Sequence, residues 1–184
     1  MAATDNRRVA LLRAVNLGGH NAVKMVDLRA FLADIGLEDA ETLLQSGNVV
    51  FSSPRTPGDL ETWLETEARA RLGLDAAFFV RTSRDWRAII ERNPFPDEAK
   101  TDPSHLVVHA LKQKVGAVEG KRLTQEINRL GGPERSDVAG PHVYLSYPAG
   151  IGRSKLTPIV IERALGTIGT ARNWNTVLRI AALL

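Results

Sequence analysis

A polar, glycine-containing loop follows the first apolar run of the chain and carries side chains suited to binding a ligand. It spans residues 13–24, and its candidate ligand-binding residues are Asn16, Gly18, Gly19, Asn21 and Lys24. Consecutive glycines expose backbone N–H groups, which bind anions in front of a helix N-terminus. The spacing is neither that of a Walker A loop nor that of a dinucleotide fingerprint. In the competing structural interpretation, Asn16 and Asn21 satisfy the loop backbone and Asn21 caps the next helix.

A second polar cluster lies near the C-terminus, at residues 170–176. Arg172 offers a fork of donors suited to phosphate or carboxylate, and Asn175 adds an amide. We expect Asn173 to cap the final helix and Trp174 to fill core space. Capping alone requires neither Arg172 nor Asn175, so this cluster is the second candidate for ligand binding.

The glycine-rich loop 150–155 is basic and precedes a predicted helix. Ser154 is expected to be the N-cap of that helix. Arg153 and Lys155 are either anion-binding residues or ordinary exposed surface. The bases of the C-terminal part also include Arg172 and Arg179, and such a basic stretch favours anionic partners.

Catalytic chemistry is poorly indicated. The absence of cysteine excludes disulfides, thiol catalysis and zinc–cysteinate sites, and fits a cytoplasmic protein. His20, inside the first loop, could move protons because its pKa lies near neutrality, and Lys24 is the other candidate. His105 and His109 fall on one face of a predicted strand without a carboxylate at ligand spacing, so no metal site is expected. His142 is interpreted as a turn residue.

Composition is that of a soluble globular protein. The chain has 184 residues, is 43% hydrophobic and 24% charged, and carries a net charge of +3. This length buries a core without disulfides or metals. No apolar run approaches the roughly 20 residues of a membrane span, so no membrane partner is expected.

The apolar pattern of the first half predicts a ferredoxin-like unit. The expected elements are a strand at 9–15, a helix at 28–35 ending at Gly36, strands at 41–45 and 49–53 around the turn 46–48, a helix from Pro57 to Gly73, and a strand at 76–81. This β-α-β-β-α-β order is typical of that fold. Its first and third strands are antiparallel neighbours, which places Asn48 near Asn16.

The same order of elements is expected a second time, without a residue-level repeat. After a connector helix at 83–92, the elements are a strand at 106–111, a helix at 118–130, strands at 134–139 and 143–147, a helix at 156–165, a strand at 167–171 and a last helix at 174–183. We therefore predict an α+β protein of two ferredoxin-like halves with antiparallel sheets. The first half is residues 1–82, the connector is 83–104, and the second half with the C-terminal helix is 105–184.

Several motifs resemble a bacterial family known as domain of unknown function 1697. They are Leu12-Arg13-Ala14-Val15-Asn16-Leu17-Gly18-Gly19, Lys24-Met25, Ser46-Gly47-Asn48-Val49-Val50-Phe51, Asn93-Pro94-Phe95 and Gly169-Thr170-Ala171-Arg172-Asn173-Trp174-Asn175-Thr176-Val177. The similarity extends over nearly the whole chain. It implies two ferredoxin-like halves, and it implies no activity, cofactor or catalytic residue.

We expect the chain to bind a small anionic ligand, which is a nucleotide, a phosphate or a carboxylate metabolite. The predicted site consists of Asn16, Gly18, Gly19, Asn21, Lys24, Asn48, Arg172 and Asn175. Whether the protein is an enzyme, which cofactor it uses and its oligomeric state are left open by these residues.

The alternative hypothesis is an RNA-binding protein, since open ferredoxin-like sheets stack bases on strand aromatics. The strand aromatics are Phe51, Phe78, Phe79, Tyr144 and Tyr147. The alternation typical of RNA-binding strands is absent, and the adjacent Phe78 and Phe79 face opposite sides of a strand. Binding would then depend on Arg153, Lys155, Arg172 and Arg179, would be salt-dependent, and ranks below the small-ligand hypothesis.

Overall fold

The structure is a computed structural model that describes residues 6–13, 23–37, 39–43 and 47–184. The chain divides into two compact units. One consists of the residues up to Ala88 together with Arg179–Leu184, and the other of Ile89–Leu178. The sequence-based division at 83–104 stays a prediction.

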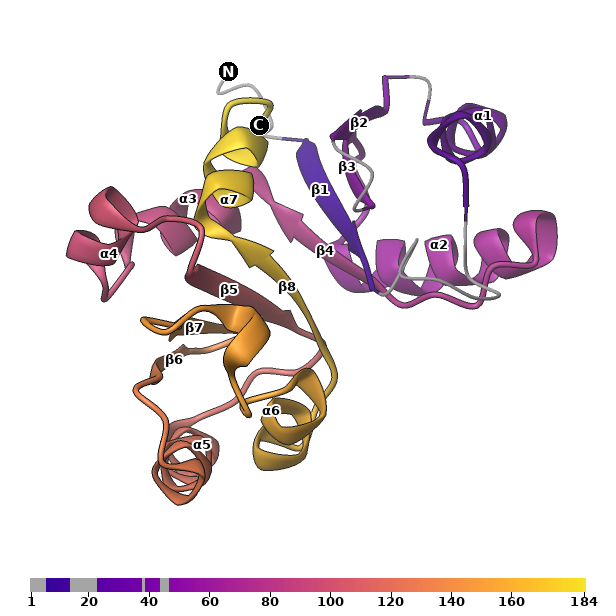
Figure 1. Cartoon of the computed structure of the whole chain (residues 1–184). Coiled ribbons are helices and arrows are strands. Elements are labelled where there is room, and N and C mark those ends of the chain that lie inside the picture. Colours follow the sequence, from indigo (N-terminus) through magenta and orange to yellow (C-terminus); the bar gives the residue numbers. More distant parts are fainter. Residues whose placement is uncertain (1–5, 14–22, 38, 44–46) are drawn as a thin grey trace. The chain divides into compact units, whose positions relative to one another are not determined.

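The first unit contains four strands and the helices that follow them in sequence (Figure 1). Its elements are β1 (Arg7–Leu12), α1 (Met25–Asp34), β2 (Glu41–Leu43), β3 (Asn48–Ser52), α2 (Pro57–Leu72), β4 (Phe78–Thr82) and the first turns of α3 (Ser83–Glu91). The strands form an antiparallel sheet in the order β2-β3-β1-β4. Its core lies between the sheet and helices α1 and α2.

The second unit repeats this arrangement (Figure 1). Its elements are α4 (Pro96–Thr101), β5 (Leu106–Leu111), α5 (Ala117–Leu130), β6 (Arg135–Ala139), β7 (His142–Ser146), the 3₁₀ helix η1 (Ile151–Arg153), α6 (Pro158–Leu165), β8 (Gly169–Asn173) and the start of α7 (Trp174–Ala181). The sheet order is β6-β7-β5-β8, again antiparallel. The prediction of an α+β fold with two ferredoxin-like halves is confirmed.

Local signals explain where helix α2 begins and ends. Thr56 is its N-cap and accepts a hydrogen bond from the Asp59 N–H at 3.3 Å, Pro57 is its first residue, and Gly73 ends it in the left-handed conformation. In contrast, the N-cap position of α1 is the exposed Lys24, three residues after Asn21, the expected cap, and the Lys24 side chain makes no capping hydrogen bond.

Two local predictions in the second half are wrong, and one short helix was not predicted. The N-cap of α6 is Thr157, because Ser154 instead ends η1 and accepts the Leu156 N–H at 3.0 Å. His142 is no turn residue: it is the buried first residue of β7. The short helix α4 was not expected, since its apolar pattern is weak and none of its residues is buried.

Backbone hydrogen bonds reveal a repeat that the sequence hides. The N–H of Leu12 donates to the carbonyl of Gly47, and in the second half the N–H of Leu111 donates to that of Pro141. Likewise, Arg13 donates to Ala77 where Lys112 donates to Ile168. Ser53 donates to Asn6 where Tyr147 donates to His105. The two halves can therefore be matched residue by residue along their strands, although the connecting loops differ in length.

One turn of the first unit requires glycine for two reasons. Gly47 has a φ of 69°, and a Cβ at this position would lie 2.9 Å from the Cβ of Leu12. Gly73 has a similar φ of 61° but nothing within 4 Å of its virtual Cβ, which makes it a matched control.

We predict that Gly47→Ala lowers the free energy of unfolding by at least about 1 kcal/mol more than Gly73→Ala. Both variants incur the left-handed penalty of about 1–2 kcal/mol, and only Gly47→Ala adds a steric overlap. Urea denaturation of both variants measures the difference. Equal decreases in the free energy of unfolding would show that the turn accommodates the added methyl group without further strain.

Candidate functional site

The outer edge of β4 shows how this fold provides hydrogen-bond acceptors for the outward N–H groups of an edge strand. Among the strands that the structure describes, β4 pairs only with β1, so alternate N–H groups point away from the sheet. Each of them donates to a carboxylate: Phe78 to Glu65 at 2.9 Å, Val80 to Glu61 at 2.7 Å, and Thr82 to Asp85 at 3.1 Å. In the first unit the edge is therefore closed by three acidic side chains.

The matching edge strand of the second unit, β8, is closed at only one of its three positions. Ile168 accepts from Lys112 on the β5 side, so Gly169, Ala171 and Asn173 present their N–H groups outward. Gly169 donates to Glu162 at 3.0 Å, as Phe78 does to Glu65. Within the part of the chain that the structure describes, the N–H groups of Ala171 and Asn173 have no acceptor.

The missing acceptors follow directly from the sequence. One helical turn before Glu162 stands Pro158, where α2 carries Glu61. At the third position of α7 stands Thr176, where α3 carries Asp85. The second half thus has two substitutions that remove carboxylates, and each opens one donor of the same strand edge.

A cavity of about 340 Å³ lies along this edge. It is lined by Val107, His109, Tyr147, Ile151, Ser154, Leu156, Thr157, Pro158, Ala171 and Asn173. His109 and Tyr147 are each only 4% exposed, and among the described residues neither side chain has a hydrogen-bond partner. By strand register His109 takes the place of Ala10, and Tyr147 that of Ser53.

Both buried side chains are neutral donors at neutral pH. Burial, and then the charge of Arg172, lower the pKa of His109 to about 4. Burial, and then Glu134, raise the pKa of Tyr147 above its usual range. The cavity therefore offers an imidazole N–H, a phenolic O–H, the side-chain amide of Asn173 and two backbone N–H groups, which is a donor-rich environment.

Arg172 blocks the backbone acceptor that lies between the Ala171 and Asn173 donors. Its Nη1 donates to the carbonyl of Ala171 at 2.7 Å and to the hydroxyl of Thr170 at 3.0 Å, as Arg81 donates to the carbonyl of Val80 at 2.8 Å. Burial lowers the pKa of Arg172 to about 10, so it remains a cation at neutral pH. The edge consequently combines outward donors with a positive charge.

The predicted site residues are distributed over both units. Asn16, Gly18, Gly19 and Asn21, together with His20, lie outside the described residues. Lys24 is exposed, and Asn48 is buried with its Nδ2 donating to the carbonyl of Leu43 at 2.9 Å.

In the second unit, Arg172 and the exposed Asn175 flank the cavity in sequence but do not line it. Asn173 caps α7, as predicted, by accepting the Thr176 N–H at 3.0 Å, and it also lines the cavity. Sequence reasoning missed this site because His109 sits in an otherwise apolar strand, and the open N–H groups become visible only when the halves are matched.

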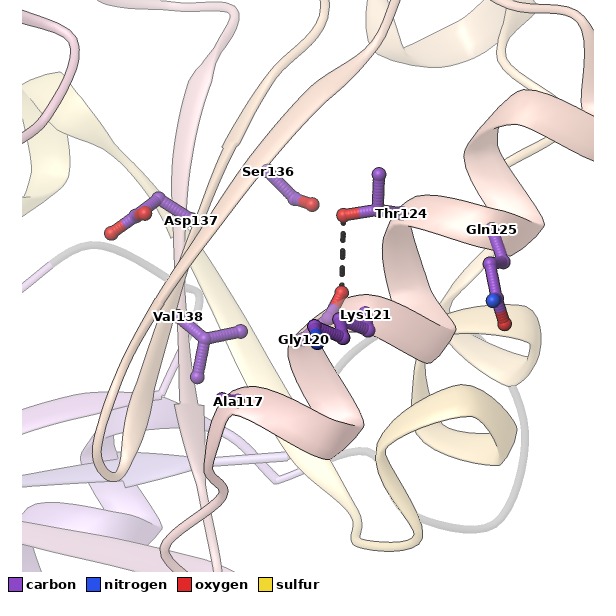
Figure 2. Close-up of a pocket in the computed structure, with 8 residues that line it drawn as sticks. All are labelled: Ala117, Gly120, Lys121, Thr124, Gln125, Ser136, Asp137 and Val138. Carbon is purple, nitrogen blue, oxygen red and sulfur yellow. Dashed lines mark hydrogen bonds between the residues drawn. The ribbon is translucent and has the colours of Figure 1, made fainter.

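A second hollow, between α5 and β6, has a different character (Figure 2). Gly120 allows the close approach, since a Cβ there would lie 3.3 Å from Val138. Thr124 donates to the carbonyl of Gly120 at 3.1 Å, and Asp137 points away from the helix. Lys121 and the other α5 side chains around this hollow are exposed. The polar groups of this hollow are exposed to solvent or hydrogen-bonded within the helix. We therefore interpret the hollow as a consequence of how α5 packs on β6 and not as a binding site.

The five strand aromatics considered for RNA binding are buried. Phe51 and Phe78 belong to the core of the first unit and Tyr147 to that of the second. The hydroxyl of Tyr144 donates to the carbonyl of Ile89 at 2.7 Å. Of the basic residues considered for RNA, Arg172 is buried, whereas Arg153, Lys155 and Arg179 are exposed.

No group of three or more histidine and acidic side chains is arranged to hold a metal ion among the described residues, although His105 does have a carboxylate neighbour, Asp102, at 2.8 Å. None of the helices in the described ranges is long and apolar enough to cross a membrane.

Comparison with known proteins identifies relatives by sequence and by fold. The family described as protein of unknown function (DUF1697) has a profile that matches residues 6–144. The solved structure of a conserved bacterial protein from Streptococcus pneumoniae is similar, with a TM-score of 0.69, 22% sequence identity, and coverage of 96% of this chain and 97% of that chain. At this identity the likeness shows the fold alone. No curated protein matches the chain.

The carboxylate closure of β4 predicts a stability effect. Glu61→Ala should lower the free energy of unfolding by about 1–3 kcal/mol, because the Val80 N–H loses its acceptor in a half-buried position. Glu67→Ala, which removes the surface pair with Arg71, should cost about 0.5 kcal/mol. Denaturant titration compares the two, and similar small losses would show that water replaces Glu61.

Burial of His109 predicts a pH-dependent stability. The unfolded chain protonates this histidine near 6.5 and the folded chain near 4, so the unfolded state binds more protons between these values. Stability should fall as pH decreases through this window, by on the order of 3 kcal/mol. His109→Gln should remove that part of the slope. An NMR titration in which the His109 ring protonates near pH 6.5 would contradict the prediction.

Proposed function

Since this chain belongs to the family described as protein of unknown function (DUF1697), whose description names no activity, we propose from the site itself that it binds a small anionic ligand in the cavity beside β8. The bound group is a carboxylate or phosphate that accepts hydrogen bonds from the strand edge. This is the ligand class expected from the sequence, now at residues that the structure describes.

One observation carries the proposal. Where the first half closes its edge strand with Glu61 and Asp85, the second half leaves the N–H groups of Ala171 and Asn173 open toward a cavity. In the first half, carboxylate side chains accept hydrogen bonds from the equivalent N–H groups. A carboxylate is therefore a suitable ligand for the open N–H groups of the second half. An anion that takes this place satisfies donors that otherwise rely on water.

The surroundings favour a negative charge. Arg172 lies close enough to lower the pKa of His109, and Arg153 and Lys155 are exposed on the segment that leads into α6. The buried His109 and Tyr147 add donors from the floor of the cavity. Glu134, which hydrogen-bonds Ser154, is the acidic neighbour that an anion must tolerate.

Other expectations stay predictions. The shared site that includes Asn16, Gly18, Gly19, Asn21, Lys24 and Asn48 is one, and a cytoplasmic location is another. RNA binding stays the alternative function, supported only by exposed bases such as Arg153, and a gel-shift assay across salt concentrations distinguishes it.

Titration with acetate and with inorganic phosphate, followed by ¹H–¹⁵N NMR, tests the proposal. We expect the amide signals of Ala171 and Asn173 to shift saturably and to move downfield, because a charged acceptor shortens the hydrogen bond. The amide of Gly169, already bonded to Glu162, should move least and serves as an internal control.

A variant that restores the missing carboxylate provides the control. Pro158→Glu reproduces the position of Glu61 and should occupy the Ala171 donor internally, which weakens anion binding by at least tenfold. Pro158→Gln removes the same proline without adding a charge and should bind more tightly than Pro158→Glu. If neither anion perturbs Ala171 or Asn173 in the unmodified protein at millimolar concentrations, the proposal fails.

A further inference from the structure

The geometry of the two open donors points to a ligand class, and this inference rests on the proposed anion site. We infer that the cavity takes a linear dicarboxylate, with one carboxylate on the N–H of Ala171 and the other on the N–H of Asn173. The ligand then replaces two side chains of the other half, Glu61 and Asp85, with a single molecule.

The spacing of the donors requires two acceptor groups. Ala171 and Asn173 are two residues apart on one strand, and alternate N–H groups of a strand point in the same direction about 7 Å apart. The oxygens of one carboxylate or one phosphate are too close together to lie in line with both. In the first unit, Val80 and Thr82 accordingly use two different carboxylates.

A peptide cannot add to this edge as a further strand, because the carbonyl between the two donors is already hydrogen-bonded. Strand addition needs donors and acceptors in alternation, and the carbonyl of Ala171 lies between the two N–H groups. That carbonyl already accepts from Nη1 of Arg172 at 2.7 Å. The edge therefore presents a donor, a cation and a donor in sequence, which complements an acceptor at each end of a short chain.

The cavity accounts for the remaining polar groups. His109 lies directly opposite Ala171 across the β5–β8 pair, so its ring N–H can donate to the carboxylate at that end. The side-chain amide of Asn173, whose oxygen accepts from Thr176, keeps its Nδ2 donor for the carboxylate at the other end. Val107 and Leu156 offer apolar surface to the carbon chain.

A chain-length series tests the inference. Isothermal titration calorimetry would use acetate, malonate, succinate, glutarate and adipate as probes on the full chain at constant ionic strength. We expect the affinity to rise along the series, to be highest for glutarate or adipate, and to exceed that of acetate by at least tenfold, because the longer chains match the donor spacing.

A pair of variants at one end of the site separates two-point from one-point binding. Thr176→Asp restores the equivalent of Asp85 and should close the Asn173 donor, while Thr176→Asn is the uncharged control. For Thr176→Asp the advantage of glutarate over acetate should fall to less than threefold, with acetate binding retained at Ala171. Circular dichroism and the unperturbed Gly169 amide confirm that both variants are folded.

The outcomes distinguish this inference from the proposed function. Saturable binding with acetate and glutarate within twofold of each other overturns the dicarboxylate and leaves the anion site standing. Absence of binding by every probe, inorganic phosphate included, overturns both. A glutarate advantage that persists in Thr176→Asp also overturns the inference, since the second carboxylate would then lie elsewhere.

Discussion

The outward N–H groups of an edge strand must find an acceptor, and this constraint organises both halves of the molecule. An edge strand pairs on one side only, so every second backbone donor faces away from the sheet. In the first half, the helix that precedes β4 and the helix that follows it each supply acids, so that Glu61, Glu65 and Asp85 close the edge completely. The position of both helices relative to the strand is thereby fixed by charge as well as by apolar contact.

The second half keeps the backbone framework of this arrangement and changes the side chains along its edge strand. The backbone hydrogen bonds of its strands match those of the first half, and Glu162 still closes the first position of β8. Four of the differences between the halves concern this edge and its cavity: His109 stands for Ala10, Tyr147 for Ser53, Pro158 for Glu61 and Thr176 for Asp85. The second half thus gains two buried donors, the side chains of His109 and Tyr147, and lacks two carboxylate acceptors. Its edge strand therefore borders a cavity lined with hydrogen-bond donors.

Sequence alone was sufficient for the fold because its signals are local and strong. The cap at Thr56, the glycines that end α2, α5 and α6, and the short apolar strands give the order of elements almost without error. The errors arose where a tertiary partner decides, as for Ser154, which bonds Glu134 instead of capping a helix. The cavity could not be predicted, because its main feature is an absence of acceptors beside Ala171, which is seen only against the equivalent Val80. The sequence predicts Arg172 as a ligand-binding cation, and in the structure its Nη1 donates to the carbonyl of Ala171 while its side chain does not line the cavity.

A crystal structure of the chain grown with glutarate tests the central claim most directly. The account predicts electron density for the ligand along β8, with one carboxylate oxygen within hydrogen-bonding distance of the Ala171 nitrogen and another within the same distance of the Asn173 nitrogen. These positions should superpose on the carboxylates of Glu61 and Asp85 when the two halves are aligned. Density for glutarate at another place, with Ala171 and Asn173 bonded only to water, would contradict it.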